Sequence, residues 1–94
     1  MPIQPSETER VRLVSRKNFV AMISKGEIIR CIVREGVSIV ALGEKKNGAL
    51  VALRRTYGGP STWQTSDRPL KTLQGMGCTE VVVRQDYSNI EFFD

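Results

Sequence analysis

Three arginines in the middle of the chain, Arg30, Arg34 and Arg54, have the side-chain chemistry that suits a phosphate group. The planar guanidinium group forms two parallel, charge-assisted hydrogen bonds with phosphate oxygens. Tyr57 and Trp63 lie close by in the sequence, and aromatic rings of this kind provide platforms on which unpaired bases stack. These five residues are therefore the predicted site for DNA or RNA, provided that the fold brings them to one surface.

Two turn signals indicate how the fold would position the arginines. Glu35-Gly36 separates residues 28–34 from residues 37–43, and Asn47-Gly48 separates the second run from residues 49–55. Asn-Gly favours a two-residue type I′ turn, because both central residues of that turn need a positive φ. The central part of the chain is therefore predicted to be a three-stranded antiparallel meander with two-residue turns.

The pairing of side chains follows by counting outward from these turns. Arg30 is expected opposite Ala41, and Ala41 opposite Arg54, with all three side chains on one outward face. The other side chains expected on this face are Arg34, Ile32, Ile39 and Ala52. The opposite face is expected to meet the core and carries Ile29, Cys31, Val40, Leu42 and Leu53. A phosphate backbone would lie in the groove between Arg30 and Arg54, about 10 Å wide.

The same outward face supports an alternative function, a homodimeric protein-interaction module that makes no contact with nucleic acid. Ile32, Ile39 and Ala41 make the face more apolar than is usual for a surface left to water. A second copy would cover this patch and leave arginines at its rim, a composition typical of interfaces. Three aromatic residues of the C-terminal tail complete the predicted interface: Tyr87, Phe92 and Phe93.

The N-terminal region has two interpretations. Ser6 and Glu9 have the spacing of a capping box, which predicts a helix that starts there and continues to Gly26. Alternatively, residues 11–14 form a short strand and the helix begins at Ser15. Both interpretations place a helix immediately before Gly26. They differ over residues 11–14, which are helix in the first and strand in the second.

The region after the meander predicts a strand, a helix and a last strand. Residues 62–65 carry β-favouring side chains at alternate positions and are expected to return as a fourth strand. Ser66 is a good N-cap for a helix that ends at Gly77, and residues 79–84, with three consecutive valines, predict the final strand. The predicted fold class is α+β, a small antiparallel sheet with two helices on one face, in the order α-β-β-β-β-α-β.

The bulk properties suit a single domain over residues 1–94. Residues 1–5 contain two prolines and are expected to be flexible, whereas residues 86–94 form an acidic aromatic tail expected to pack on the body or on a neighbour. A chain this short has a modest core, so a homo-oligomer is expected. With no apolar run long enough for a membrane span and no secretory signal, we expect a cytoplasmic location.

The distribution of charge suits a polyanionic partner. The chain carries 14 basic and 10 acidic side chains, a net charge of +4. Residues 10–34 are the most basic region, with only Glu27 against Arg10, Arg12, Arg16, Lys17, Lys25, Arg30 and Arg34. Such an excess of one sign attracts nucleic acid without selecting a sequence.

Catalytic chemistry has little support in the residue types. The chain contains no histidine, the commonest general base and the commonest metal ligand. Cys31 and Cys78 lack a Cys-x-x-Cys partner and are expected to be buried free thiols, and whether they meet in the fold stays open. The glycines form no phosphate-binding loop. We therefore expect no catalytic residue, no metal and no cofactor, and a protein that is not an enzyme.

The second half of the sequence resembles the ParC-type partition-associated proteins of plasmids and related mobile elements, which are unrelated to the topoisomerase subunit of that name. The residues that carry the resemblance, within residues 50–84, are Val51–Arg55, Thr62–Thr65, Leu70, Leu73, Gly77 and Val81–Val83. Pro69 and Gly75 depart from the alanine-rich helix usual at this place. The resemblance implies an accessory role in plasmid maintenance or replication control, with DNA or a DNA-bound partner, and it identifies no functional residue.

Overall fold

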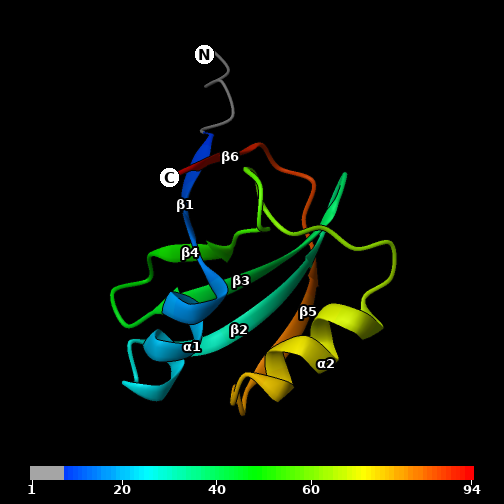
Figure 1. The fold of residues 1–94 in the computed structure, drawn as a ribbon. Coiled ribbons are helices and arrows are strands. Elements are labelled where there is room, and N and C mark those ends of the chain that lie inside the picture. Colours follow the sequence, from blue (N-terminus) through cyan, green and yellow to red (C-terminus); the bar gives the residue numbers. More distant parts are fainter. Residues whose placement is uncertain (1–7) are drawn as a thin grey trace.

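The computed structural model describes residues 8–94, which form one six-stranded mixed sheet and two helices (Figure 1). The elements in chain order are β1 (Glu9–Val14), α1 (Arg16–Ser24), β2 (Ile28–Glu35), β3 (Ile39–Lys45), β4 (Leu50–Leu53), α2 (Asp67–Gly75), β5 (Val81–Gln85) and β6 (Ile90–Phe93). The strand order in the sheet is β5-β2-β3-β4-β1-β6. The meander β2-β3-β4 is antiparallel, whereas the pairs β1–β4, β1–β6 and β2–β5 are parallel. The predicted α+β class is therefore confirmed, and the predicted antiparallel sheet is confirmed only for the meander.

The side chains of β1 decide between the two interpretations of the N-terminal region. Val11 and Leu13 are buried, and they alternate with the exposed Arg10 and Arg12. This period of two residues is that of a strand, whereas a helix would bury side chains three or four residues apart. Residues 11–14 are therefore strand.

The cap of α1 corrects the helix start suggested by the capping box. The Ser15 hydroxyl oxygen accepts a hydrogen bond from the Asn18 N–H at 3.2 Å, as an N-cap does. The helix ends before Gly26, whose φ of 75° is the left-handed conformation common just beyond a helix. Of the proposed capping box, Glu9 lies in β1, and Ser6 lies outside the described residues. The element order is therefore β-α-β-β-β-α-β-β.

Residues 62–65 do not form the fourth strand that their composition predicts. Trp63 makes a single bridge to Ile39, with its N–H donating to the Ile39 carbonyl oxygen at 3.0 Å. α2 begins directly after Ser66, only three residues later, which leaves no length for a ladder. The bounds of α2 agree with the prediction, because Ser66 occupies the N-cap position and Gly77, with a φ of 98°, follows the last turn, but the Ser66 side chain makes no capping hydrogen bond.

The Asn-Gly turn differs from the predicted type I′ turn. The Gly48 N–H donates to the Lys45 carbonyl oxygen at 2.9 Å, and Gly48 has a φ of 84°, while Asn47 does not adopt a positive φ. The Asn47 side chain instead accepts a hydrogen bond from the Ala49 N–H at 3.0 Å. These features define a three-residue loop, a type I turn followed by a glycine bulge.

The first hairpin also has a three-residue turn, so the register of the meander differs from the predicted one. Glu35 pairs with Ile39 across the turn, and Arg30 lies opposite Glu44 instead of Ala41. A shift by an odd number of residues exchanges the two faces of a strand relative to its partner. The predicted assignment of β3 side chains to the two faces is therefore wrong.

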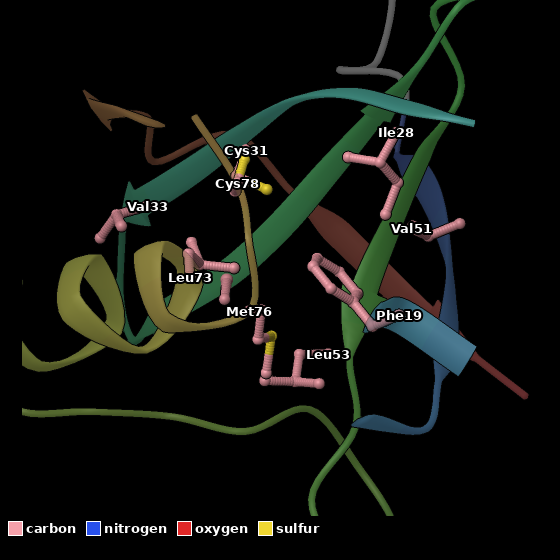
Figure 2. Close-up of a cluster of buried hydrophobic side chains, with 10 residues drawn as sticks. Phe19, Ile28, Cys31, Val33, Val51, Leu53, Leu73, Met76 and Cys78 are labelled. Atoms are coloured by element: carbon pink, nitrogen blue, oxygen red, sulfur yellow. The ribbon is translucent and has the colours of Figure 1, made fainter. Parts of the chain in front are cut away.

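Buried apolar side chains form two clusters, one on each face of the sheet. The helix-side core, drawn in Figure 2, consists of Phe19, Ile28, Cys31, Val33, Ala41, Val51, Leu53, Leu73, Met76 and Cys78. The second core, on the other face, consists of Val11, Leu13, Ile32, Val40, Leu42 and Ala52. Val40 and Leu42, which were expected beside Leu53, thus lie on the face opposite to it.

The C-terminal tail packs on the body as β6. The connection from β5 leads from one edge of the sheet to the other, where β6 pairs in parallel with β1 (Figure 1). Ile90 and Phe92 pack against the second core from this position. They help to explain why that core is buried although both helices contribute to the opposite one.

Candidate nucleic-acid interface

Arg30 on β2 is neutralised by two carboxylates. Its Nε donates to Glu80 Oε1 at 2.9 Å, and its Nη1 donates to Glu44 Oε1 at 3.1 Å. The hydrogen bond and charge of Glu80, together with the charge of Glu44, raise the pKa of Arg30. A phosphate group would have to compete with both carboxylates for this guanidinium group.

Arg34, on the same face of β2, is buried, with 7% of its surface exposed. Its Nη2 donates to the backbone carbonyl oxygen of Ser88 at 2.5 Å and lies 3.9 Å from Asp86 Oδ1. Hydrogen bonds from the Ser88 hydroxyl and N–H, with a smaller contribution from Arg34, lower the pKa of Asp86. Arg34 therefore holds the connection between β5 and β6 and presents little surface to a ligand.

Arg54 directly follows β4, and its Nη1 lies 3.7 Å from Asp94 Oδ1. Because side chains alternate along strands, Arg30, Arg34 and Arg54 share the face that carries the second core. Each of the three has an oxygen partner within the chain. They do not form an open row around a groove.

The two aromatic residues of the predicted site lie in different surroundings. Tyr57 is 86% exposed, in a turn held by hydrogen bonds from Arg55 Nε to the carbonyl oxygens of Tyr57 and Gly58. Trp63 packs partly against the helix-side core and lines a cleft of about 890 Å³ that also contains Arg68. We call this cleft the Trp63 cleft. Its remaining lining comes from Gly36, Val37, Ser38, Ile39, Thr62, Gln64 and Thr65.

The residues of the predicted dimer interface do not share one surface. Ile32 is buried in the second core and Ala41 in the helix-side core, and Ile39 packs partly against the latter. Phe92 packs against the second core, whereas Phe93 lies beneath the Arg10 guanidinium group, 4.6 Å from it. Tyr87, in the connection between β5 and β6, is exposed.

The structure brings together a group of basic residues that the predicted site does not include. Two adjoining cavities, of about 350 and 290 Å³, lie beside the C-terminal end of α1 and the turn between β3 and β4. Both are lined by Lys25, Glu27 and Lys45, and Arg12 and Lys46 complete the charged lining. We call this surface the basic cleft. Among residues 8–94, four cations and one carboxylate line it.

Each cation of the basic cleft is placed by a different part of the fold. Arg12 lies on β1 opposite Val51 of β4, Lys25 caps the end of α1, Lys45 ends β3, and Lys46 follows in the turn. Within residues 8–94, none of these four side chains forms an ion pair. The basic composition of residues 10–34 was the one sequence signal for this site, since the parallel pairing of β1 with β4 has no local signature.

Cys31 and Cys78 lie side by side in the helix-side core as free thiols (Figure 2). The Cys78 thiol donates to the Glu80 carbonyl oxygen at 3.2 Å. Burial, and then the hydrogen bond with Cys78, raise the pKa of Cys31. In the part of the chain that the structure describes, no group of three or more histidine, cysteine, aspartate or glutamate side chains could hold a metal ion.

Comparisons with known proteins add no family to this description. A scan against protein-family models, a search of curated proteins and a search of solved structures each gave no match. Neither helix between residues 8 and 94 has the length and apolar character needed to cross a membrane.

Proposed function

We propose that this protein is a non-catalytic accessory protein that binds nucleic acid, or a nucleic-acid-bound partner, through the basic cleft. The observation that carries the proposal is that Arg12, Lys25, Lys45 and Lys46 line one surface, with Glu27 as its only carboxylate among residues 8–94. Lysine and arginine side chains without internal partners bind backbone phosphates and displace counterions from them. This site differs from the predicted arginine face, where each guanidinium group already has an oxygen partner.

The geometry of the basic cleft favours contact with the phosphate backbone over recognition of bases. Both cavities are shallow spaces between α1 and the β3–β4 turn, and α1 has only nine residues, so this region offers no long helix for a major groove. Contacts to phosphate position a protein on nucleic acid without reading its sequence. We therefore expect weak sequence preference and strong dependence on salt.

The Trp63 cleft offers a second contact to a single strand. Its aromatic ring and Arg68 are the partners that an unpaired base would use for stacking and for charge. The cleft borders Ile39 at the start of β3, whereas Lys45 ends the same strand, about 20 Å away at strand geometry. Trp63 is the chain's single tryptophan, so its fluorescence reports directly on whether a base stacks there.

The proposal is tested by comparing two double variants in a binding assay. Fluorescence anisotropy with labelled single-stranded DNA, duplex DNA and single-stranded RNA measures the affinity of each. Lys25→Ser with Lys45→Ser should weaken binding about tenfold or more, because two phosphate contacts are lost. Arg30→Ser with Arg54→Ser is the matched control and should weaken it less than about threefold. Equal losses in both variants, or no binding by the wild-type protein, would refute the proposal.

The resemblance to ParC-type proteins supports a plasmid or mobile element as the setting of this activity. An accessory protein of that kind would be expected to affect inheritance of the element. Loss of the gene should lower plasmid retention without selection, and the Lys25→Ser and Lys45→Ser variant should not restore it. Unchanged retention in the absence of the gene would reject this setting while leaving nucleic-acid binding to the assay above.

A further inference from the structure

Strand β5 is an edge strand with an exposed apolar surface. It pairs with β2 on one side, and it ends the six-stranded sheet on the other. Its sequence begins with three valines; Val83 is 48% exposed, and Val81 and Val82 are half-buried. A regular apolar edge of this kind is a template for pairing with another strand unless it is blocked.

The backbone groups of β5 divide between its two sides. The Cys31 N–H donates to the Glu80 carbonyl oxygen at 2.9 Å, and the Asp86 N–H donates to the Glu35 carbonyl oxygen at 3.0 Å. In a parallel ladder the groups of alternate residues point the same way, so the even-numbered residues of β5 face β2. The N–H and carbonyl groups of the odd-numbered residues Val81, Val83 and Gln85 therefore point away from the sheet.

The side chains along this edge are complementary to those of a second copy that runs antiparallel to it. Val82 and Arg84 share one face of the strand with Glu80, which directly precedes β5, and Val81 and Val83 share the other. In an antiparallel pair centred on Val82, Glu80 of one copy meets Arg84 of the other, and every valine meets a valine. This centre also makes Val81 and Val83 of the two copies hydrogen-bonded pairs, which is the arrangement that their outward-pointing backbone groups require.

Other pairings of the same edge are less favourable. A centre at Val83 also matches the backbone groups, but it sets Glu80 of one copy against Asp86 of the other. A centre at Arg84 sets the two copies of that arginine against each other. Like charges directly opposite are destabilising in a sheet. Of these three pairings, the one centred on Val82 sets opposite charges against each other and also pairs the outward-pointing backbone groups.

We propose that the protein forms a two-fold symmetric dimer through antiparallel pairing of β5 with β5 of a second copy, centred on Val82. The pairing extends two six-stranded sheets into one continuous sheet and places both α2 helices on the same side of it. Arg84 lies opposite Arg34 within the protomer and has no ion pair among residues 8–94. Glu80 of the second copy supplies the missing partner. This dimer does not involve the basic cleft, so its test is independent of the test of nucleic-acid binding.

The test is the molecular mass as a function of concentration. A short strand pair gives a small interface, and dissociation constants of small interfaces are typically micromolar or weaker. Static light scattering during gel filtration should rise from 10.5 kDa toward twice that mass as the protein is concentrated from about 10 to 500 μM. Lys17→Glu, an exposed substitution on α1, is the control and should leave this rise unchanged.

Two opposite charge changes test the register. Arg84→Glu alone and Glu80→Arg alone should each remain monomeric, because like charges then face each other across the two-fold axis. An equimolar mixture of the two variants should form a heterodimer, since all four charged positions become complementary. A wild-type protein that stays at 10.5 kDa throughout, or a mixture of two variants with wild-type circular dichroism that stays monomeric, would overturn the proposal.

Glu80→Arg also removes the contact with Arg30, and loss of that contact destabilises the monomer. Hydrogen exchange of the wild-type protein tests the dimer without any variant. The amides of Val82 and Arg84 point toward β2 and should be protected at every concentration. The amides of Val81 and Val83 should exchange rapidly at low concentration and become protected at high concentration. Rapid exchange of the second pair at all concentrations would contradict the dimer.

Discussion

Arg34 on β2 donates a hydrogen bond to the backbone carbonyl oxygen of Ser88, in the connection that leads from β5 to β6. The guanidinium group thereby joins β2, the strand next to one edge of the sheet, to the segment that reaches the other edge. Asp86, on the same connection, lies 3.9 Å from the same side chain. This contact makes a residue that looks like a phosphate ligand in the sequence into a support for the C-terminal strand.

Truncation of Arg34 tests this structural role. Arg34→Ala leaves the Ser88 carbonyl oxygen and the Asp86 carboxylate without their buried partner, so the free energy of unfolding should fall by about 1–3 kcal/mol. Arg54→Ala removes only an exposed pair with Asp94 and should cost less than about 1 kcal/mol. Urea unfolding measures both. Equal losses would mean that Arg34 is not the buried anchor described above.

Two glycines give opposite predictions for the same substitution. A Cβ atom at Gly36 would lie 2.7 Å from the Asp86 carbonyl oxygen and 2.8 Å from Arg34 Nη1, so Gly36→Ala should destabilise the protein by about 1–3 kcal/mol. Gly75, the last residue of α2, has nothing within 4 Å of such an atom. Gly75→Ala should therefore stabilise the protein by up to about 1 kcal/mol. Melting temperatures that move in the same direction for both would contradict this packing.

The strand register has its own test in two leucines. Leu42 and Leu53 belong to different cores on opposite faces of the sheet. Truncation of either to alanine should cost about 2–5 kcal/mol. The two losses should add to within about 0.5 kcal/mol in the double variant, because the side chains share no contact. A coupling energy above about 1 kcal/mol would indicate the type I′ register, in which the two leucines are direct neighbours.

The buried thiol of Cys31 predicts a loss of stability at alkaline pH. Its pKa is raised by burial, so the folded state keeps a proton that the unfolded chain releases near pH 8.5. The unfolded state then binds fewer protons, and the free energy of unfolding falls as the pH rises above that value. The loss of stability from this group grows with each further rise in pH while the folded thiol keeps its proton. Urea unfolding between pH 7 and 10 should show a shallower decline in Cys31→Ala than in the wild-type protein, and parallel declines would contradict the assignment.

Local signals in the sequence predicted most of the elements and little of their arrangement. The bounds of α2, the end of α1 at Gly26 and the three strands of the meander follow from turn residues and periodicity. The turn lengths do not, because Asn-Gly suits both a type I′ turn and a type I turn with a glycine bulge, and the choice between them moves the register by one residue. Odd shifts at both turns placed Val40 and Leu42 on the face opposite to the predicted one.

The candidate site was less predictable than the fold, for a physical reason. Arg30, Arg34 and Arg54 were identified by type, but their partners Glu80, Ser88 and Asp94 lie far along the chain. The remaining partner of Arg30, Glu44, lies opposite it only in the observed register of β2 and β3. The basic cleft depends in the same way on the parallel pairing of β1 with β4. Long-range pairings of this kind leave no trace in a window of neighbouring residues.

The salt dependence of nucleic-acid binding by the basic cleft tests the central claim most directly. The logarithm of the association constant should fall linearly with the logarithm of salt concentration, with a slope of roughly −3 to −4 for the four cations Arg12, Lys25, Lys45 and Lys46. The Lys25→Ser and Lys45→Ser double variant should flatten that slope by about two, and the Arg30→Ser and Arg54→Ser double variant should leave it unchanged. A slope that flattens for the arginine variant and stays steep for the lysine variant would contradict binding at the basic cleft and would indicate that nucleic acid binds at the arginine face.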